Sequence, residues 1–393
     1  MMITRNAQRH HGGRIVTAIG AAAAVAVVLA GCSASAETPA DNGSSSSPSS
    51  ANSALADEVQ QLTQPLDAYP MPTEAVTGVS ELAGGTIYYV PITLRAPQFA
   101  VTQAGIEAAA AAAGLKVQVC DGQGNPTGVS SCIDQATQAK AIGVVTDGLP
   151  YDLAANSIDA AQSAGIPVII SNQIASDRHP VTPTLAYVPP AGSEQLIALS
   201  KWITLDSDGA ANILFNRSTD GEAQKSYVQA ATTALPDFCP SCTATVYDVS
   251  SANFAQIPAS TSSELLKNPD IDYIVSEFAE YLHPASEGVQ QAGLTGKVKM
   301  LAAASALSNI EEVSKGGLAT VSAQAAAYQG WVDLDAVLRL IAGQELPEYT
   351  IPIRLFTPES AKDVTLTAEA EQSGEWFGPT TFTDDFKKLW AIA

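Results

Sequence analysis

Short apolar runs alternate with helical segments along the chain from Thr86 to about residue 170. The runs "TIYYV" (86–90), "LKVQV" (115–119), "AIGVV" (141–145) and "IPVII" (166–170) predict strands, and the segments 99–113, 132–139 and 152–165 predict helices. Strands that are continuously apolar and alternate with helices of about 10 to 15 residues are typical of parallel βαβ units. This half of the chain is therefore predicted to form a doubly wound α/β lobe.

The second half repeats this pattern. Strands are predicted at 211–215, 243–249, 271–275, 298–303 and 318–323, with helices between them and a further helix at 329–342. The junctions "AAGLKVQV", "AGIPVII" and "GLTGKVKML" each stop a helix at glycine and enter a strand at once. Because a chain of this length exceeds what one core usually covers, two similar α/β lobes are predicted.

The first 31 residues carry the features of an export signal. Arg5, Arg9 and Arg14 occur without any acidic residue and precede a stretch of alanine and valine at 15–30. A spanning helix usually needs ~20 apolar residues, and this stretch is shorter and rich in alanine. A removed signal peptide is therefore favoured over a retained membrane span.

Cys32 directly follows this stretch, in the sequence "LAGC". The four residues resemble the lipobox of bacterial lipoproteins, in which the peptide is cut before the cysteine and the cysteine is lipidated. The alternative is an ordinary buried cysteine, but residues 33–56 are rich in Ser, Ala, Pro, Asn and Gly and cannot bury much apolar surface. The prediction is a signal peptide at 1–31, a lipidated Cys32 and a flexible tether over 32–83.

Charge and the remaining cysteines agree with export. The formal net charge is -21, and loss of the three signal arginines would make it -24 (-21 - 3), which disfavours nucleic-acid partners. The four other cysteines are an even set, as expected in an oxidising compartment. Their proximity in sequence suggests the pairs Cys120–Cys132 and Cys239–Cys242, although three connectivities are possible.

Enzyme chemistry finds little support in the sequence. The "CPSC" of Cys239 to Cys242 follows a predicted helix and opens none, so a structural clip is favoured over a redox site. The cysteine spacing does not fit a zinc site. The motifs G-x-S-x-G, G-x-x-x-x-G-K-[ST] and G-x-G-x-x-G after a strand are all missing. We therefore expect no enzyme activity, no catalytic residue, no metal and no cofactor.

Several stretches, in this order and spacing, resemble one known family. They are "TIYYVPITLRAPQFAVTQAGIEAAAAAAG", "AGIPVIISNQ", "GGLATVSAQAAAYQGW" and the C-terminal "FKKLW". Together they resemble the sugar-type (type I) periplasmic binding proteins, the solute-binding subunits of ABC importers, whose family includes ribose-binding protein. The similarity extends over about residues 84–393.

This resemblance implies two lobes joined by a hinge of three crossings that closes on a ligand. The crossings are expected near 187–190, 324–328 and 347–350. Lobe 1 would comprise 84–188 and 326–348, and lobe 2 would comprise 189–325 and 349–393. Transcription repressors that share the fold carry a helix-turn-helix ahead of it, where this chain has a lipid signal, so a repressor is excluded.

The carboxyl ends of the strands predict the ligand site, because open α/β sheets bind ligands there. Polar and aromatic residues just after the strands are therefore candidates, among them the segment 216–220. The candidate ligand-binding residues are Arg95, Gln98, Phe99, Asp147, Asn172 and Gln173 in lobe 1, and Gln224, Glu277, Phe278, Ser305 and Gln324 in lobe 2.

Each candidate also has a purely structural interpretation. Arg95 could be an exposed loop charge, and Phe99 could be the first core residue of its helix. Asn172 and Gln173 could cap the turn after their strand. Asp147 could be a plain turn residue, and Glu277 could be solvated.

The resemblance implies further roles at these positions. Sugar binders of the family stack an aromatic residue on the sugar, and Phe99 occupies one such position, with Gln98 in place of a second aromatic. Charged family residues are replaced here by Asn172 with Gln173, Gln224, Phe278 with Ala279, and Ala304 or Ser305. Charge-assisted hydrogen bonds are about twice as strong as neutral ones, so we expect a ligand with fewer hydroxyls than ribose. Candidates are a modified sugar, an aromatic solute, or an acid paired with Arg95.

The predicted function combines these features. We expect an extracytoplasmic, membrane-anchored lipoprotein, acting as a monomer, that captures a small organic solute and delivers it to an ABC transporter permease. The alternative is a ligand-sensing lipoprotein that signals to a membrane receptor without transport.

Overall fold

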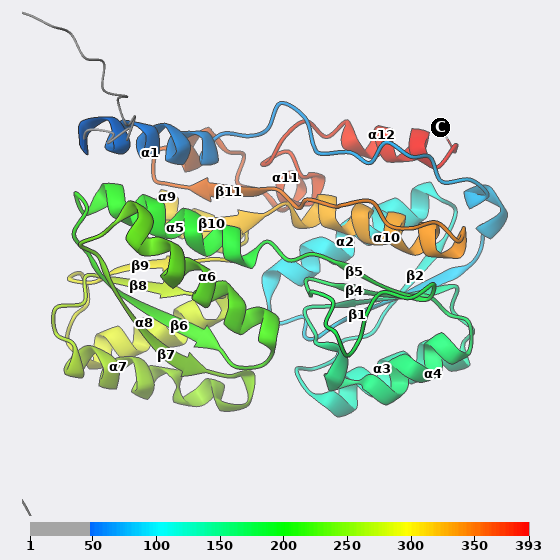
Figure 1. Cartoon of the computed structure of the whole chain (residues 1–393), viewed down its shortest axis with the longest axis horizontal. Helices are drawn as coiled ribbons and strands as arrows, with labels where there is room; N and C mark the ends of the chain where they lie inside the picture. Colours follow the sequence, from blue (N-terminus) through cyan, green and yellow to red (C-terminus); the bar gives the residue numbers. More distant parts are fainter. Residues whose placement is uncertain (1–47, 393) are drawn as a thin grey trace, which may run out of the picture. The chain divides into compact units, whose positions relative to one another are not determined.

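The structure of the protein is a computed structural model that describes residues 48–392 (Figure 1). The predicted signal peptide, Cys32 and the first part of the predicted tether, 32–47, lie outside these residues. Across the described part of the chain, no helix combines the length and apolar character that a membrane crossing requires.

Lobe 1 is built on a five-stranded parallel sheet with the order β2-β1-β3-β4-β5. Its strands are β1 (Thr86–Pro91), β2 (Lys116–Val119), β3 (Gly143–Asp147), β4 (Val168–Ser171) and β5 (Leu185–Val188). Its helices are α2 (Pro97–Ala112), α3 (Pro126–Gln138), α4 (Ala155–Ser163) and α10 (Ala326–Ile341). Ile87 and Tyr89 pack under α2 and α10, whereas Tyr88 and Val90 pack against α3 and α4. This alternation explains why β1 is apolar throughout.

Lobe 2 contains a six-stranded sheet with the order β11-β10-β9-β8-β6-β7, in which only β11 is antiparallel. Its strands are β6 (Asn212–Ser218), β7 (Thr243–Val249), β8 (Tyr273–Ser276), β9 (Lys299–Ala302), β10 (Thr320–Gln324) and β11 (Ile353–Phe356). Helices α5 (Gly192–Asp206) and α6 (Glu222–Phe238) cover one face, and α7 (Ile257–Lys267) and α8 (Leu282–Gln291) cover the other. Helix α9 (Leu307–Ser314) precedes β10. The two lobes confirm the predicted fold class.

Short 3-10 helices complete the secondary structure of the two lobes. They lie at Val79–Leu82, Tyr151–Leu153, Ser251–Gln256, Ala279–Tyr281 and Ser360–Asp363. The chain passes from lobe 1 to lobe 2 after β5, returns after β10 to form α10, and passes to lobe 2 again before β11.

The structure corrects the predicted tether for residues 48–83. Helix α1 (Pro48–Leu62) packs on lobe 2, where Val59 is 6% exposed beside Leu199 and Glu58 pairs with Lys201. The following residues then run to lobe 1, where Tyr69 and other apolar side chains are buried. The composition suggested a tether, but Leu55, Val59 and Leu62 stand at the spacing of a helix face.

The C-terminal residues also differ from the prediction that 349–393 belong to lobe 2. Helices α11 (Ala368–Ser373) and α12 (Phe382–Leu389) follow β11, and α12 packs on α10 of lobe 1. The Trp390 ring stacks on Trp331 at 5.5 Å, and its Nε1 donates to Asp335 at 2.7 Å. The aromatic contacts with α10 thus place the last helix on lobe 1.

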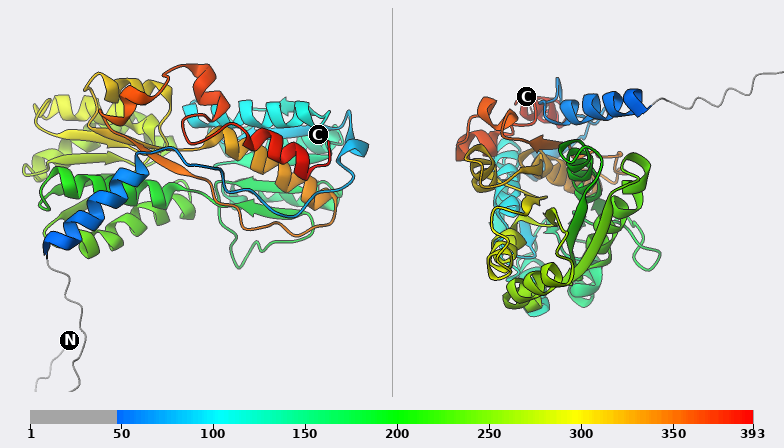
Figure 2. Two further views of the ribbon diagram at one scale, coloured as in Figure 1. Left: turned by 90° about the horizontal axis from the view of Figure 1, so that it is seen from above. Right: turned by 90° about the vertical axis from the view of Figure 1, so that its left-hand side faces the viewer.

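The N-terminal and C-terminal segments run side by side over both lobes (Figure 2). The Leu66 nitrogen donates to the Phe377 carbonyl at 2.7 Å, and the Val76 nitrogen donates to the Leu389 carbonyl at 2.8 Å. Buried Arg354 of β11 donates to the Thr63 carbonyl at 2.9 Å. Each end of the folded chain therefore passes once between the lobes, in addition to the crossings of the hinge.

Candidate functional site: a cavity between the lobes

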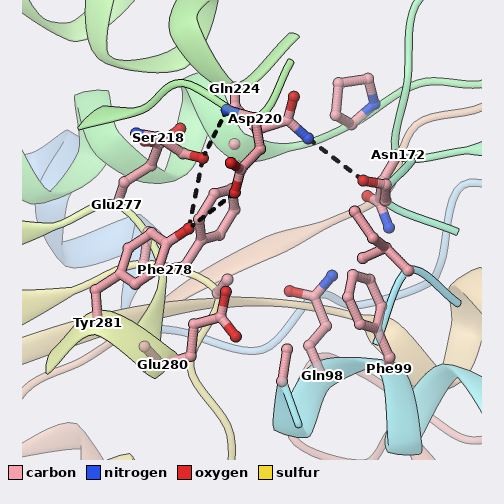
Figure 3. Close-up of a pocket in the computed structure, with 18 of the residues that line it drawn as sticks. Gln98, Phe99, Asn172, Ser218, Asp220, Gln224, Glu277, Phe278, Glu280 and Tyr281 are labelled. Atoms are coloured by element: carbon pink, nitrogen blue, oxygen red, sulfur yellow. Dashed lines mark hydrogen bonds between the residues drawn. The ribbon is translucent and has the colours of Figure 1, made fainter. Parts of the chain in front are cut away.

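A cavity lies between the lobes, where the carboxyl ends of strands from both sheets meet (Figure 3). The centre of a water-sized sphere can move through about 80 Å³ of it, several times the ~10–15 Å³ that one water needs. The larger polar and aromatic side chains that line it are Gln98, Phe99, Asn172, Gln195, Asp220, Gln224, Tyr227, Glu277, Phe278, Glu280, Tyr281 and Gln324. The cavity can therefore hold a small organic ligand against residues of both lobes.

Asn172 lines the cavity from lobe 1, directly after β4. Its Nδ2 donates to Oδ1 of Asp147 at 2.7 Å, and its Oδ1 accepts from Nε2 of Gln324 at 3.1 Å. Its φ of 56° lies in the left-handed region, which asparagine adopts more readily than most residues. Asn172 therefore connects a buried carboxyl group of lobe 1 to strand β10 of lobe 2.

Asp147 lies behind Asn172 and is completely buried. Burial raises the pKa of Asp147 to about 6, against the lowering effect of hydrogen bonds from Asn172 and Tyr89. A second buried carboxyl group, that of Asp333, accepts from the Ser171 hydroxyl at 2.7 Å. Burial, with repulsion from Asp147, raises the pKa of Asp333 well above its usual range. Lobe 1 thus contains two interacting carboxyl groups behind the cavity.

These carboxyl groups predict that stability falls as the pH rises from about 4 to about 6. Asp147 has a pKa of about 6 when folded and an ordinary value of 3.8. Between these values the folded protein keeps a proton that the unfolded chain has released, so the free energy of unfolding decreases with pH. Calorimetric melting temperatures across this range measure the effect, and Asp147→Asn should flatten the curve.

Asp384→Asn is the control for this experiment. Asp384 is exposed, and Lys387 lowers its pKa, so its contribution to the pH dependence has the opposite sign. An unchanged slope in Asp147→Asn, together with normal folding, would contradict the assignment to Asp147.

A row of hydrogen-bonded amide side chains connects lobe 2 to lobe 1 at the hinge. Gln195 of α5 donates from Nε2 to Oε1 of Gln324 at 3.2 Å and accepts from the Ala304 nitrogen at 2.9 Å. Gln324 also donates to Gln329, whose own Nε2 donates to the Ser171 hydroxyl at 2.7 Å. Because every donor in this row has an acceptor, the position of Gln324 in the cavity is fixed.

Glu277 lines the lobe 2 side of the cavity, directly after β8. It is 1% exposed, and its Oε2 accepts from the Ser218 nitrogen. Its Oε1 has no hydrogen-bond partner in the protein. Burial is the main reason that the pKa of Glu277 lies well above its usual range. The alternative interpretation, that this side chain is simply solvated, is therefore wrong.

Aromatic rings and a second carboxyl group surround Glu277. The Phe278 ring lies 5.8 Å from that of Tyr281 and 6.5 Å from that of Tyr227. Asp220 accepts from the Ser251 hydroxyl at 2.6 Å. It also accepts from the Tyr281 hydroxyl at 3.5 Å (Figure 3). Lobe 2 therefore presents aromatic faces and carboxyl groups to the cavity.

Hydrogen bonds between the lobes hold the cavity closed. Nε2 of Gln224 donates to the Gly148 carbonyl at 3.5 Å, and the Tyr227 hydroxyl donates to the Asn172 carbonyl at 3.4 Å. Gly148 has a φ of 71°, and a Cβ there would lie 2.5 Å from the Phe99 ring. A glycine is thus required at this point of contact.

Most of the sequence-predicted site residues meet at this cavity. Gln98, Phe99, Asn172, Gln224, Glu277, Phe278 and Gln324 line it. Asp147 lies behind Asn172, and Gln173 is buried without contributing to the lining. Ser305 borders a smaller adjoining space together with Gln98 and Gln324.

Arg95 lies apart from the other predicted residues. It is exposed and borders an outer groove with Phe254, Glu280 and His283 instead of the cavity itself. Burial raises the pKa of Glu280, and the Arg95 charge opposes this shift. Arg95 therefore acts on one carboxyl group from outside the cavity.

The sequence did not single out every lining residue. Ser218 and Asp220 fell within the segment 216–220, but Gln195, Tyr227 and Tyr281 were missed because they lie on helical segments and not at strand ends. Tyr227 follows Gln224 by three residues, so the helical repeat of α6 could have indicated it.

The disulfide bridges join Cys120 to Cys132 and Cys239 to Cys242, which confirms the suggested pairing. The first bridge spans the loop after β2. In this loop the Asp121 carboxylate accepts from the Leu94 nitrogen at 3.1 Å, and the Gly124 nitrogen donates to the Ile92 carbonyl at 2.7 Å. Because Ile92 and Gly124 both line the cavity, this bridge braces part of its wall.

A family model described as a periplasmic binding protein domain matches residues 87–345. Since the match covers most of both lobes, the chain belongs to this family of periplasmic binding proteins. The resemblance predicted from the sequence is thereby confirmed. No curated protein matches the sequence.

Solved structures share the fold at low sequence identity. One is an ABC transporter solute-binding protein from Actinobacillus succinogenes with bound D-allose (18% identity, TM-score 0.61, 71% of this chain and 99% of that chain). A second is a 5-methylthioribose transporter solute-binding protein from Thermotoga lettingae (16% identity, TM-score 0.64, 77% of this chain and 96% of that chain). A third is a chain of the XylFII–LytSN complex (18% identity, TM-score 0.60, 70% of this chain and 99% of that chain). At these identities the similarity shows the fold alone.

Proposed function

We propose that this protein is the extracytoplasmic solute-binding lipoprotein of an ABC importer, which encloses a sugar-like solute and delivers it to a membrane permease. The observation that carries this proposal is the cavity itself, lined from both lobes and bridged by hydrogen bonds between them. A ligand held there stabilises the closed form, because it contacts both lobes at once. The permease would distinguish the closed surface from the open one.

The lining favours a sugar-like ligand over an organic acid. Asp220, Glu277 and Glu280 line the cavity, whereas Arg95 lies in the outer groove. An anion would face carboxyl groups in a cavity between the lobes, where repulsion is screened less than in bulk water. The related structures were solved with D-allose and 5-methylthioribose, which supports a sugar or modified sugar here.

Signalling to a membrane receptor is the second candidate function. One protein with this fold was solved as part of the XylFII–LytSN complex, which shows that the fold can associate with another protein. Solute uptake distinguishes the two functions. Deletion of the gene should abolish uptake of the bound solute if the protein serves an importer, and should leave uptake intact if it serves only a receptor.

The first experiment is a thermal-shift screen of the full chain with sugars, polyols, aromatic acids and amino-acid derivatives. A ligand at a hundredfold excess over its Kd should stabilise the folded state by about 2.7 kcal/mol. Calorimetry then gives the affinity. Tight binding of an aromatic acid with no response to any sugar would contradict the proposal.

Membrane attachment is expected to depend on Cys32. Cys32→Ser should abolish incorporation of labelled fatty acid and release the protein into the soluble fraction, because one thiol carries the proposed anchor. The double variant Cys239→Ser/Cys242→Ser is the matched control, since it removes thiols of a structural bridge and should keep the label. Retention of Cys32→Ser in the membrane fraction would contradict lipid anchoring at this position.

A further inference from the structure

The cavity presents hydrogen-bond acceptors that have no partner in the protein. They are the Oε1 atoms of Gln98, Gln224 and Glu277, and these residues are 9%, 7% and 1% exposed. The amide of Gln224 is oriented by its Nε2, which donates to the Gly148 carbonyl, so its oxygen is left free. Buried polar atoms are rarely left unpaired, and these oxygens line the cavity, where hydroxyl or ammonium groups of a ligand can donate to them.

The side chains that line the cavity include acidic groups and no basic groups. Asp220, Glu277 and Glu280 contribute carboxyl groups, and none of the lining side chains is a Lys, Arg or His. Arg217 faces Glu277 from β6, but it lies outside the cavity and pairs with Asp248 at 2.8 Å. The described residues contain no group of His, Cys, Asp and Glu side chains that could hold a metal ion. An organic cation is therefore the kind of ligand that matches this charge.

Glu277 is the carboxyl group best placed to receive such a cation. Asp220 already accepts two hydrogen bonds from Ser251 and one from Tyr281, and Glu280 lies beside Arg95. Glu277 has one oxygen bonded to the Ser218 nitrogen and one oxygen free. The rings of Phe278 and Tyr281 next to it offer the electron-rich faces on which ammonium groups bind.

We propose that the cavity binds a hydroxylated ligand that carries a protonated amine, an amino sugar in chemical class, with Glu277 as the partner of the ammonium group. This inference rests on the proposed solute-binding function. The ligand hydroxyls donate to the free oxygens of Gln98 and Gln224, and the ammonium group donates to Glu277. Anionic sugars are excluded by the same carboxyl groups.

Proton release should accompany this binding. Burial raises the pKa of Glu277, and Asp220 and Asp248 raise it further, while Arg217 and the Ser218 nitrogen lower it. The Tyr227 hydroxyl also faces Glu277, and burial keeps it neutral by raising its pKa. A bound ammonium group favours the carboxylate, so Glu277 gives its proton to solvent as the ion pair forms. Affinity for an amine therefore rises with pH until the amine itself loses its proton.

Calorimetry on the full chain tests the proposal with matched pairs of sugars. The pairs are glucosamine with glucose, galactosamine with galactose and mannosamine with mannose, and glucuronate serves as the anion. The expected result is that one amino sugar binds at least tenfold more tightly than its neutral partner and more tightly at pH 7 than at pH 6. Glu277→Gln should erase this preference and the pH dependence, while Glu311→Gln, a half-buried charge on α9 that pairs with Lys315, should change neither.

Each other outcome has a definite meaning. Equal or tighter binding of a neutral sugar or of glucuronate overturns the amine proposal and leaves the proposed solute-binding function in place. An amine preference that survives in folded Glu277→Gln overturns the role of Glu277. Failure of every sugar in the set to bind overturns the amino-sugar proposal, and failure of the wider ligand screen as well would overturn the proposed function.

Discussion

Gly330→Val is expected to destabilise lobe 1 strongly. Helices α2 and α10 cross so closely that a Cβ on Gly330 would lie 2.5 Å from the Ile106 nitrogen and 2.6 Å from the Thr102 carbonyl oxygen. These are backbone atoms and cannot rotate away, so the helices would have to separate. Overpacking of this kind costs about 1–3 kcal/mol or more, out of a total stability of about 5–15 kcal/mol. At about 2–4 °C per kcal/mol, we expect a melting temperature lower by roughly 2–12 °C, measured by calorimetry.

Ala108→Val is the matched control for this substitution. Ala108 lies on the exposed side of α2, so the same β-branched side chain is introduced into a helix without a close neighbour. Gly105, opposite Gly330 in the crossing, should behave like Gly330, because its Cβ would lie 2.3 Å from the Ala327 carbonyl oxygen. Equal melting temperatures for Gly330→Val and Ala108→Val would contradict the close crossing.

The sequence predicted the two lobes because parallel strands buried on both faces are apolar throughout. Nine of the strands overlap the predicted runs, and β7 coincides with the predicted 243–249. The strands β5 and β11 were missed for local reasons. β5 is a run of four residues at a predicted crossing, and β11 contains Arg354, whose charge is satisfied by the distant Thr63 and Trp376 carbonyls.

The ends of the folded chain could not be predicted from local composition. Residues 63–83 are held by partners far away in sequence, such as Arg339, which donates to the Glu74 carbonyl at 2.7 Å. The Tyr69 hydroxyl likewise donates to the Gly374 carbonyl at 2.6 Å. A segment with little regular secondary structure therefore becomes ordered when another part of the chain completes its hydrogen bonds.

Site residues were predicted from the sequence where the chain topology alone places them at the lobe interface. They were missed where they reach the site only when the two lobes close. Asn172, Gln224 and Glu277 were found because they follow strands or begin a helix at the lobe interface. Tyr227 contributes only when the lobes meet, through its bond to the Asn172 carbonyl. Arg95 is absent from the lining for a different reason, because it lies at the outer groove beside Glu280.

Asn172→Gly is expected to weaken ligand binding by about 10- to 100-fold. The substitution removes the bonds from Nδ2 to Asp147 and from Gln324 to Oδ1, so the Asp147 carboxyl and the Gln324 amide each lose a partner. Hydrogen bonds to a charged group contribute about 1.5–3 kcal/mol, which corresponds to this range of affinity. Gln324 keeps its bonds with Gln195 and Gln329 but loses the one to Asn172, so the ligand must order its side chain further on binding.

Asn172→Ala separates the side-chain effect from the backbone effect. Asn172 has a φ of 56°, which glycine adopts freely and alanine adopts at a cost of about 1–2 kcal/mol. Both variants should therefore lose affinity to a similar degree in calorimetry, while Asn172→Ala alone should also show the lower melting temperature that backbone strain produces. Unchanged affinity in a folded Asn172→Gly would show that the link from Asp147 through Asn172 to Gln324 does not position the ligand site.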